Sequence, residues 1–519
     1  PKRVLRTLAR MRRSSALWLM VAVGLASCTS WLGAGTDAIA PTTTVSLINT
    51  TESAAPTTSS TVSSTTTTIP VREAGTVPGW TVGQAWGSVR GLTMFRGNPT
   101  RTYYGEPPVP TNPDVLWSYP AGDSLCSRSN VAGTSTVWCG TGWTGQPVVY
   151  ERTDGVTEVI FGAYDKKVHF LDGSTGLPTR APFVTGDLIK GSVSLDPDGF
   201  PLLYFGSRDN KLRIVALDRP EPDLLWDLDA SAVRGIWNND WDGNPVVLDD
   251  LLLEGGENSW FFIIKLNRGY DAAGFVTVQP ERLIEVPGYT DDLISRVGSN
   301  VSIENSPAVF DNRVYFANSG GRIVGLDLSE IAAGQAPVVF DYWVGDDVDA
   351  TITIDGEGML YIAAELERFN ERSAELGQLI KLDPYAADPF VWGVPVPPRG
   401  PGDGGLWATP ALGDGVLYAS THPGELLAVD TETGQVLWRD EIGFHAWSSP
   451  VIVDKTLVVS VNCETGGGLR AYSLADPAEP QRLWQYDHAS GCIESTPAVW
   501  KGTIFVGSRD GRFYAFGEK

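Results

Sequence analysis

Residues 406–438 read LWATPALGDGVLYASTHPGELLAVDTETGQVLW, and this stretch returns with variations towards the C-terminus. Its apolar runs are separated by turn residues such as Gly-Asp-Gly, His-Pro-Gly and Glu-Thr-Gly. Apolar runs broken in this way are typical of β-hairpins, because these residues tolerate the backbone angles of tight turns. The stretch therefore predicts one propeller blade of four short strands, at residues 410–412, 416–420, 425–430 and 435–439.

The opening of this unit, a small or polar pair before a proline, marks further units along the chain. Clear copies are WDGNP, IENSP, WSSP and IESTP, ending at Pro245, Pro307, Pro450 and Pro497. Looser copies are WTGQP, IKGSV and VDATI, ending at Pro147, Val193 and Ile352. Units of roughly 40 to 60 residues are the size of a blade. We therefore predict an all-β fold, an eight-bladed β-propeller of four-stranded antiparallel blades.

The turn that ends the quoted unit resembles a known repeat. AVDTETGQVLW at residues 428–438 resembles the signature of the PQQ-like, or quinoprotein-type, propeller family. Asp430 can accept hydrogen bonds from the turn, Gly434 supplies a positive φ, and Trp438 is expected to dock against a neighbouring blade. The resemblance extends over residues 80–519 and implies the fold more strongly than a function, since one fold hosts many activities.

Two branches of this family imply different functions. The quinone dehydrogenases in many cases hold PQQ between a tryptophan and a disulfide of adjacent cysteines, beside a Ca²⁺ with acidic and amide ligands. This chain has no adjacent cysteines, so we do not expect PQQ. The other branch includes the lipoprotein subunit of the outer-membrane barrel assembly machine and carries no quinone. The resemblance to that branch favours a non-enzymatic binding or scaffold module for envelope proteins or ligands. A PQQ- and calcium-dependent dehydrogenase of alcohols or sugars is the alternative.

Residues 1–28 have the pattern of a lipoprotein signal peptide. Six basic residues precede an apolar run at residues 16–26, which is short for a membrane span. The run ends in LASC, which resembles a lipobox, and this resemblance implies lipidation of Cys28. We therefore expect export and anchoring to the outer face of the cell membrane. A plain signal peptide or an uncleaved anchor is the alternative.

Residues 29–78 are rich in Thr, Ser, Ala and Pro. Such a composition buries too little apolar surface to fold, so we expect a disordered stalk that holds the propeller, residues 79–519, away from the membrane. An unstructured linker without this spacing role is the alternative. The Pro- and Gly-rich run at residues 94–110 is expected to lie extended across the propeller. Residues 115–120, VLWSYP, match the unit-ending strand VLWRDE at 436–441. We predict that they pair beside residues 513–516 and close the ring.

Composition and missing motifs narrow the function. The formal net charge is −23, and so acidic a surface repels phosphate backbones, which argues against nucleic-acid binding. The sequence has no GxSxG, P-loop or CxxCH motif, so hydrolase, nucleotide-binding and cytochrome functions lack support. The four histidines show no metal-ligand spacing; they are His169, His422, His445 and His488. We expect a monomeric propeller whose partner is an envelope or membrane protein complex.

Apart from Cys28, the chain contains four cysteines, Cys126, Cys139, Cys463 and Cys492. An even number in an exported protein suggests two disulfides, for which three pairings exist. We expect Cys126 to pair with Cys139, closing a short loop, and Cys463 to pair with Cys492, linking the seventh unit to the eighth. Four free thiols are the alternative. A metal site of cysteines is not expected, because no CxxC spacing occurs.

The register of the unit openings aligns one residue of each blade, three positions before the proline or its equivalent. Because the innermost strand of a blade begins at the central channel, these side chains are expected to form a ring around one mouth. The ring is Thr144, Lys190, Asp242, Glu304, Asp349, Trp407, Trp447 and Glu494. Asp242, Glu304 and Asp349 fall in consecutive blades beside the two tryptophans, a combination able to hold Ca²⁺ or a cationic group. A solvated rim without a ligand is the alternative.

Overall fold

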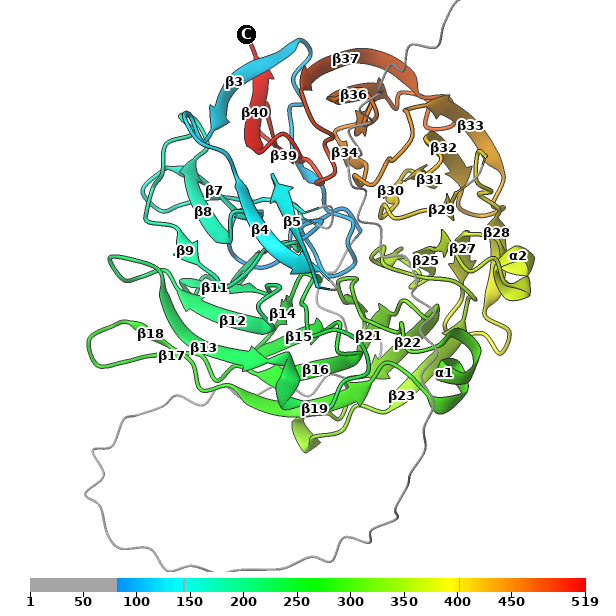
Figure 1. Cartoon of the computed structure of the whole chain (residues 1–519), viewed down its shortest axis with the longest axis horizontal. Helices are drawn as coiled ribbons and strands as arrows, with labels where there is room; N and C mark the ends of the chain where they lie inside the picture. The colour runs from blue at the N-terminus through cyan, green and yellow to red at the C-terminus, as the bar shows by residue number, and fades with distance from the viewer. Residues whose placement is uncertain (1–81, 132, 143–144, 401) are drawn as a thin grey trace, which may run out of the picture. The chain divides into compact units, whose positions relative to one another are not determined.

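The computed structural model describes residues 82–519 except residues 132, 143–144 and 401. The expected signal peptide, residues 1–28 with Cys28, and the whole expected stalk, residues 29–78, lie outside the described residues. Within them, eight sheets surround a central channel, so the predicted eight-bladed propeller is confirmed (Figure 1). No helix in this part of the chain is long and apolar enough to cross a membrane.

The first four blades follow one another along the chain, and within each blade neighbouring strands pair in sequence. The first blade contains β1 (Gly91–Leu92), β6 (Val148–Glu151), β7 (Thr157–Ala163), β8 (Lys167–Asp172) and β9 (Phe183–Val184). The second contains β10 (Ser194–Leu195), β11 (Leu202–Phe205), β12 (Lys211–Ala216) and β13 (Asp223–Asp229). The third contains β14 (Val246–Leu248), β15 (Leu251–Gly255), β16 (Trp260–Lys265) and β19 (Glu281–Pro287). The fourth contains β20 (Ala308–Phe310), β21 (Arg313–Ala317), β22 (Arg322–Asp327) and β23 (Val338–Trp343).

The remaining four blades complete the circle. The fifth contains β24 (Thr353–Ile354), β25 (Leu360–Ala363), β27 (Leu379–Leu382) and β28 (Phe390–Val394). The sixth contains β30 (Ala411–Gly413), β31 (Val416–Ser420), β32 (Glu425–Asp430) and β33 (Val436–Glu441). The seventh contains β34 (Val451–Val453), β35 (Thr456–Val461), β36 (Gly467–Ser473) and β37 (Gln481–Ala489). The eighth contains β2 (Gly105–Glu106), β38 (Ala498–Trp500), β39 (Thr503–Ser508), β40 (Arg512–Glu518) and β3 (Pro113–Tyr119).

Short ribbons and helices lie in the connections between these strands. Three two-stranded ribbons are β4 (Cys126–Val131) with β5 (Thr134–Cys139), β17 (Gly269–Tyr270) with β18 (Val276–Thr277), and β26 (Glu365–Leu366) with β29 (Gly404–Gly405). The helices are α1 (Asp291–Val297), α2 (Glu371–Leu376) and the 3-10 turns Ala230–Ala232 and Ile331–Ala333. The sixth blade has the four strands expected from residues 406–438, each starting within one residue of its predicted position.

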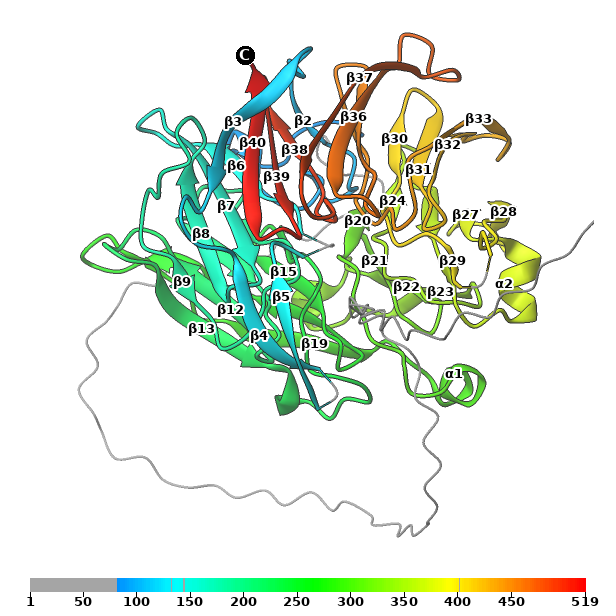
Figure 2. The same cartoon turned by 45° about the horizontal axis from the view of Figure 1, so that its top comes forward.

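The eighth blade joins the two ends of the propeller. β3 pairs antiparallel with β40, and Val115 lies opposite Phe516 while Tyr119 lies opposite Phe513. This is the predicted closure, and the blue β3 lies beside the red β40 in Figure 1. On the inner side, β2 runs parallel to β38, as Figure 2 shows. Strands from the N-terminal part of the propeller therefore flank the C-terminal strands on both sides, which closes the ring.

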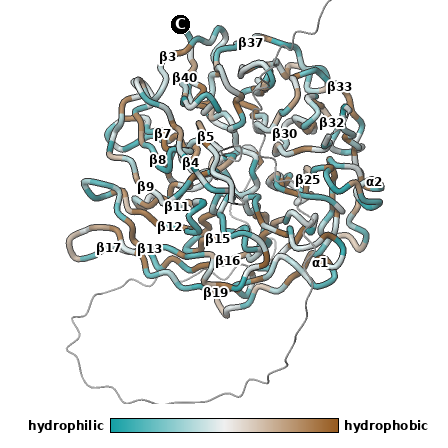
Figure 3. Tube along the Cα trace, in the orientation of Figure 1, coloured by the Kyte–Doolittle hydropathy of each residue, from teal (hydrophilic) through white to brown (hydrophobic). Residues whose placement is uncertain are grey.

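Tryptophan side chains of the outer strands pack against neighbouring blades. Trp438 packs edge-on against Tyr472 of the seventh blade, with ring centroids 5.4 Å apart. Asp430 accepts the backbone N–H of Thr433 at 2.7 Å, and Gly434 has φ +73°. These are the roles expected of the turn motif. Figure 3 shows hydrophobic residues in all the blades, because each pair of neighbouring sheets buries its own apolar layer.

Residues 91–106, here called the plug, cross the propeller and close the channel from one end. The plug exchanges hydrogen bonds with all eight blades; for example, Val309 N donates to Pro99 O at 2.8 Å and Ile354 N donates to Thr100 O at 3.1 Å. The expectation that this segment crosses the propeller is met, but it is not extended throughout. Arg96, Gly97 and Arg101 have positive φ, so the chain turns back on itself inside the channel.

Two buried arginines hold the plug in place. The guanidinium of Arg96 donates to the carbonyls of Thr409 at 2.8 Å and Pro410 at 2.9 Å. Arg101 donates to the carbonyl of Pro307 at 2.9 Å and to Asn244 Oδ1 at 3.0 Å. Both side chains are fully buried. Because burying a guanidinium is favourable only when its donors are satisfied, these carbonyls are what allows charged residues inside the channel.

Candidate functional site

A belt of hydrogen bonds lines the channel just below the predicted ring. The belt is formed by the residues that immediately precede the opening prolines or their equivalents. In five places, the backbone N–H of such a residue donates to the side-chain hydroxyl of the equivalent residue in the next blade. The donors and acceptors are Gln146 and Ser192, Asn244 and Ser306, Ser306 and Thr351, Thr351 and Thr409, and Thr409 and Ser449. The belt explains why small hydroxyl residues precede the prolines, and it fixes the ring residues two positions earlier in the chain.

Ring residues surround the mouth of the channel opposite the end closed by the plug. Glu304, Asp349 and Trp407 line one cavity with belt residues, and Phe95 of the plug also lines it. The cavity therefore opens between an acidic and an aromatic part of the ring. Thr144 lies outside the described residues. The other ring residues belong to two carboxylate clusters, an aromatic group, and two glutamates, Glu304 and Glu494, that lie beside them.

The first group is a carboxylate cluster of the third blade, here called the lysine cluster. The Lys190 ammonium lies 3.3 Å from Asp240 Oδ2, 3.0 Å from Glu257 Oε1, and also pairs with Asp242. Arg208 Nε lies 3.6 Å from Asp240 Oδ2. Burial raises the pKa of Asp242 to about 7, although Lys190 opposes this. Burial alone would lower the pKa of Lys190, but the three carboxylates hold it well above its ordinary value, so the lysine is charged.

The second group is a carboxylate cluster of the fifth blade, here called the open cluster. It consists of Asp347, Asp349 and Glu365, with a carboxylate oxygen of each within 4.8 Å of the others. Ser319 Oγ donates to Asp349 at 3.3 Å, and Arg368 lies 3.6 Å from Asp347 Oδ2. Burial raises the pKa of Asp347 to about 6 and that of Glu365 well above its ordinary value. Raised pKa values mean that burial disfavours the charged carboxylates, and a bound cation would stabilise their charged forms.

Glu304 lies between the two clusters. Ser302 donates to its Oε1 at 2.8 Å. Burial, followed by Glu257 and Asp242 on one side and Asp347 on the other, raises the pKa of Glu304 well above its ordinary value. The three carboxylates selected by register therefore do not form one group. Asp242 belongs to the lysine cluster, Asp349 belongs to the open cluster, and Glu304 lies between them.

The third group is aromatic and continues the ring through the sixth and seventh blades. The Trp407 ring lies 3.9 Å from the His422 ring and 5.9 Å from the Trp447 ring, measured between centroids. Trp447 Nε1 donates to His422 Nδ1 at 2.8 Å. Burial lowers the pKa of His422 to about 3, so this imidazole is neutral and its Nδ1 can accept. The two predicted tryptophans are therefore together at the mouth, and two histidines belong with them.

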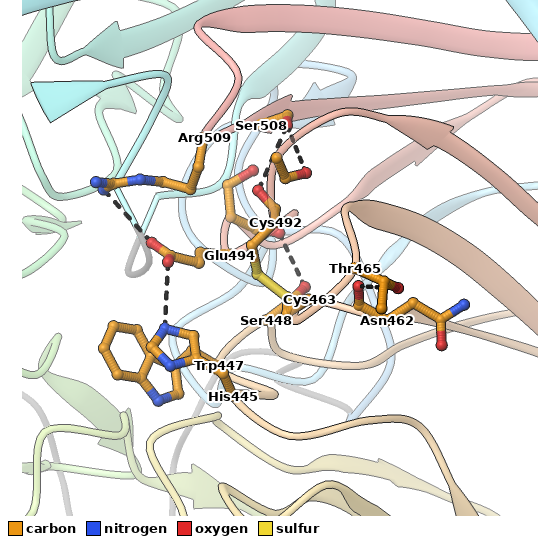
Figure 4. Close-up of a disulfide and its surroundings, with 12 residues drawn as sticks. His445, Trp447, Ser448, Asn462, Cys463, Thr465, Cys492, Glu494, Ser508 and Arg509 are labelled. Carbon is orange, nitrogen blue, oxygen red and sulfur yellow. Dashed lines mark hydrogen bonds and ion pairs between the residues drawn. A yellow bond between two sulfur atoms is a disulfide. The ribbon is translucent and has the colours of Figure 1, made fainter. Parts of the chain in front are cut away.

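Glu494 ends the ring beside a disulfide. His445 Nε2 lies 3.3 Å from Glu494 Oε1, and Arg509 lies 3.5 Å from Oε2, as Figure 4 shows. The structure joins Cys463 to Cys492 next to this pair, and Cys126 to Cys139 in the β4–β5 ribbon. Both disulfides are the expected ones. Arg509 balances the charge of Glu494 in this part of the ring.

Sequence reasoning missed several residues of the two clusters. Asp240 and Asp347 each precede their ring residue by two positions. Glu257 and Glu365 each follow the last residue of the second strand of their blade by two positions. One sequence pattern could have identified them, because it occurs in both blades. It is Asp-x-Asp before the first strand, followed by a glutamate just after the second strand. The other two histidines have different partners: His169 contacts Asp165 at 3.0 Å, and His488 packs among Tyr486, Tyr514 and Phe516.

Comparison with known proteins identifies the repeat. Residues 377–519 match the family model described as outer membrane protein assembly factor BamB. The matched blades resemble PQQ-like repeats. The protein of that name from Shewanella oneidensis is 32% identical over 100 residues, which are 18% of this chain and 24% of the relative. Quinohemoprotein alcohol dehydrogenase ADH IIB from Pseudomonas putida is 29% identical over 124 residues, 20% of this chain and 16% of the relative. The alignments thus span a quarter or less of these relatives.

Solved structures agree on the propeller architecture. A europium-containing methanol dehydrogenase superposes with a TM-score of 0.55 and 13% identity, covering 82% of this chain and 98% of that chain. At this identity the likeness shows the fold alone.

The residues at the mouth do not fit a quinone held between a tryptophan and a disulfide of adjacent cysteines. No two cysteines are adjacent in this sequence. Its disulfides join cysteines 13 and 29 positions apart. The two ring tryptophans already pack against His422 and His445.

Proposed function

We propose that the protein is a binding or scaffold module of the cell envelope, and that the channel mouth is its binding face. The observation that carries this proposal is a set of exposed aromatic side chains in the loops around the ring. Trp237 precedes Asp240 of the lysine cluster, Phe369 follows Glu365 of the open cluster, and Phe444 precedes His445. These three side chains are 44%, 54% and 41% exposed. Exposed aromatics around a polar centre are typical anchors of protein interfaces.

The closed end of the channel supports binding over catalysis. The plug fills the channel from the opposite face, and its two arginines are committed to backbone carbonyls. Among the described residues, Phe95 of the plug, ring residues and belt residues line one cavity at the mouth. The misfit of the quinone makes the dehydrogenase the less favoured alternative.

The envelope location rests on three observations of different kinds. The chain carries two disulfides, which persist in oxidising compartments outside the cytoplasm. One relative is named an outer membrane protein assembly factor. The LASC sequence at residues 25–28 supports lipidation at Cys28. We therefore propose an exported, membrane-anchored monomer that contacts an envelope protein complex.

Photo-crosslinking in intact cells tests the binding face. A photoreactive amino acid replaces Trp237, Phe369 or Phe444 in turn, and matched controls carry it at Leu224 of β13 and Leu483 of β37, which are also exposed. We expect a crosslinked envelope protein from the mouth positions and none from the outer-strand controls. Equal crosslinking at both sets of positions would refute the mouth as the binding face.

The anchor is tested separately by Cys28→Ala. We expect this variant to leave the membrane fraction, because it lacks the residue that the lipobox would lipidate. Fractionation followed by immunoblotting measures the change. Full retention of the variant in washed membranes would show that lipidation of Cys28 is not the anchor.

A further inference from the structure

The two carboxylate clusters are repeats of one another. Asp240 and Asp347 hold the same position before the ring, Asp242 and Asp349 are the ring residues themselves, and Glu257 and Glu365 follow the second strand of their blades. In each cluster, a carboxylate oxygen of every residue lies within 4.8 Å of an oxygen of the other two. The third and fifth blades therefore present three carboxylates in the same arrangement.

The ring residue of the preceding blade differs between the clusters. For the lysine cluster it is Lys190 of the second blade, whose ammonium contacts all three carboxylates. For the open cluster it is Glu304 of the fourth blade, a fourth carboxylate in place of the cation. One cluster thus contains its own cation, whereas the other has a carboxyl group at the position of that cation.

The cations near the open cluster do not replace the missing ammonium. Arg368 approaches Asp347 at 3.6 Å, but it also contacts Asp346 at 3.3 Å. Among the described residues, no donor hydrogen-bonds Glu365 Oε1 or Asp347 Oδ1. Glu365 is 2% exposed and Asp347 is 5% exposed. Buried carboxylate oxygens without donors are costly, so a site of this kind is stabilised by a ligand that supplies positive charge.

We propose that Asp347, Asp349 and Glu365 bind a Ca²⁺ ion, which takes the place that the Lys190 ammonium has in the lysine cluster. The donor set is entirely oxygen, the preference of hard cations such as Ca²⁺. Ca²⁺–oxygen distances are about 2.3–2.6 Å, so two ligands of one ion lie within about 5 Å of each other, and the 4.8 Å limit of this cluster agrees with that spacing. Asp349 lines the cavity at the mouth, so one of the three ligands faces that cavity.

Binding of Ca²⁺ at this site needs no protein partner, so it is tested on the purified full chain in detergent. The protein is first treated with a chelator, and Tb³⁺ luminescence is then excited through tryptophan, because Trp407 lines the same cavity as Asp349. Isothermal titration with Ca²⁺ gives the stoichiometry. We expect one Ca²⁺ per chain, displacement of Tb³⁺ by Ca²⁺, and a higher melting temperature with Ca²⁺.

Matched amide variants decide where the ion binds. Glu365→Gln and Asp349→Asn should weaken Ca²⁺ binding at least tenfold, whereas Glu257→Gln, the equivalent change in the lysine cluster, should leave it unchanged. Circular dichroism confirms that each variant is folded. Absence of binding at millimolar Ca²⁺, or equal loss in Glu257→Gln, would overturn the assignment. So would full binding in a folded Glu365→Gln variant. The crosslinking experiment reports on the protein partner independently of all these outcomes.

Discussion

The lysine cluster and the open cluster show how one residue changes the chemistry of a repeated site. Both place two aspartates and a glutamate at the same positions of a blade, and both are largely buried. In one, Lys190 supplies the compensating charge; in the other, Glu304 occupies the corresponding position. Buried charges are stable only with partners. A propeller can therefore turn an internal ion pair into a ligand site by changing the residue that the preceding blade contributes.

The largest expected effect comes from breaking the lysine cluster. Lys190→Met removes the ammonium and leaves Asp240, Asp242 and Glu257 without the cation that they surround. Removing one partner of a buried ion pair costs about 3–5 kcal/mol. We expect the free energy of unfolding to fall by this amount in urea unfolding without Ca²⁺.

The same variant should convert the lysine cluster into a second open cluster. Added Ca²⁺ is expected to restore part of the lost stability, about 2.7 kcal/mol at 100 times its dissociation constant. Titration should then report two ions per chain. A stability change below about 0.5 kcal/mol, typical of surface substitutions, would mean that Lys190 does not hold this cluster together.

The reciprocal change transplants the lysine. Glu304→Lys should place an ammonium beside the open cluster, so the protein no longer responds to Ca²⁺ and becomes more stable without it, by about 1.5–3 kcal/mol for hydrogen bonds to charged groups. Thermal and urea unfolding with and without Ca²⁺ measure both effects. The control is Glu304→Gln, which removes a charge but adds no cation and should still respond. A Glu304→Lys variant with an undiminished Ca²⁺ response would contradict the equivalence of the two positions.

The fold could be predicted from the sequence because its signals are local and repeated. The turn at Asp430 and Gly434 and the prolines that open each unit recur at blade spacing, so strand number, closure and ring register followed from them. The plug could not be predicted in its final form. Its course depends on positive φ at Arg96 and Arg101 and on carbonyls from several blades, and these contacts exist only in the folded ring.

The site was predictable only in part, for a similar reason. Register selected Lys190, Asp242, Glu304 and Asp349, but it treats each blade alone and does not show which residues meet across blades. Glu365 reaches the mouth from the loop after the second strand, and its burial decides its electrostatics. The sequence alone does not show that Lys190 contacts the carboxylates of the next blade, or that no lysine of the described residues does so at the open cluster.

The smallest expected effect is the pH dependence of Ca²⁺ binding, and its sign follows from burial. Burial raises the pKa of Asp347 from its ordinary 3.8 to about 6. Between about pH 4 and 6 the folded, metal-free protein therefore binds more protons at this group than the unfolded chain does, so the contribution of Asp347 to stability falls as the pH rises through this window. Charged groups that act on it are Asp346, Asp349, Glu365, Glu367 and Arg368.

The affinity for Ca²⁺ changes with pH in the opposite direction: it rises as the pH rises, because the ion competes with these protons for the carboxylates. From pH 7.5 to pH 5, protonation of Asp347 alone should raise the Ca²⁺ dissociation constant about tenfold, or about 1.4 kcal/mol, and the raised pKa of Glu365 adds to this. Calorimetric titration at the two pH values measures the change. The Glu257→Gln variant should keep the same slope, because the lysine cluster does not hold the ion. An affinity that is equal at both pH values would place the bound Ca²⁺ at carboxylates with ordinary pKa values, outside the open cluster.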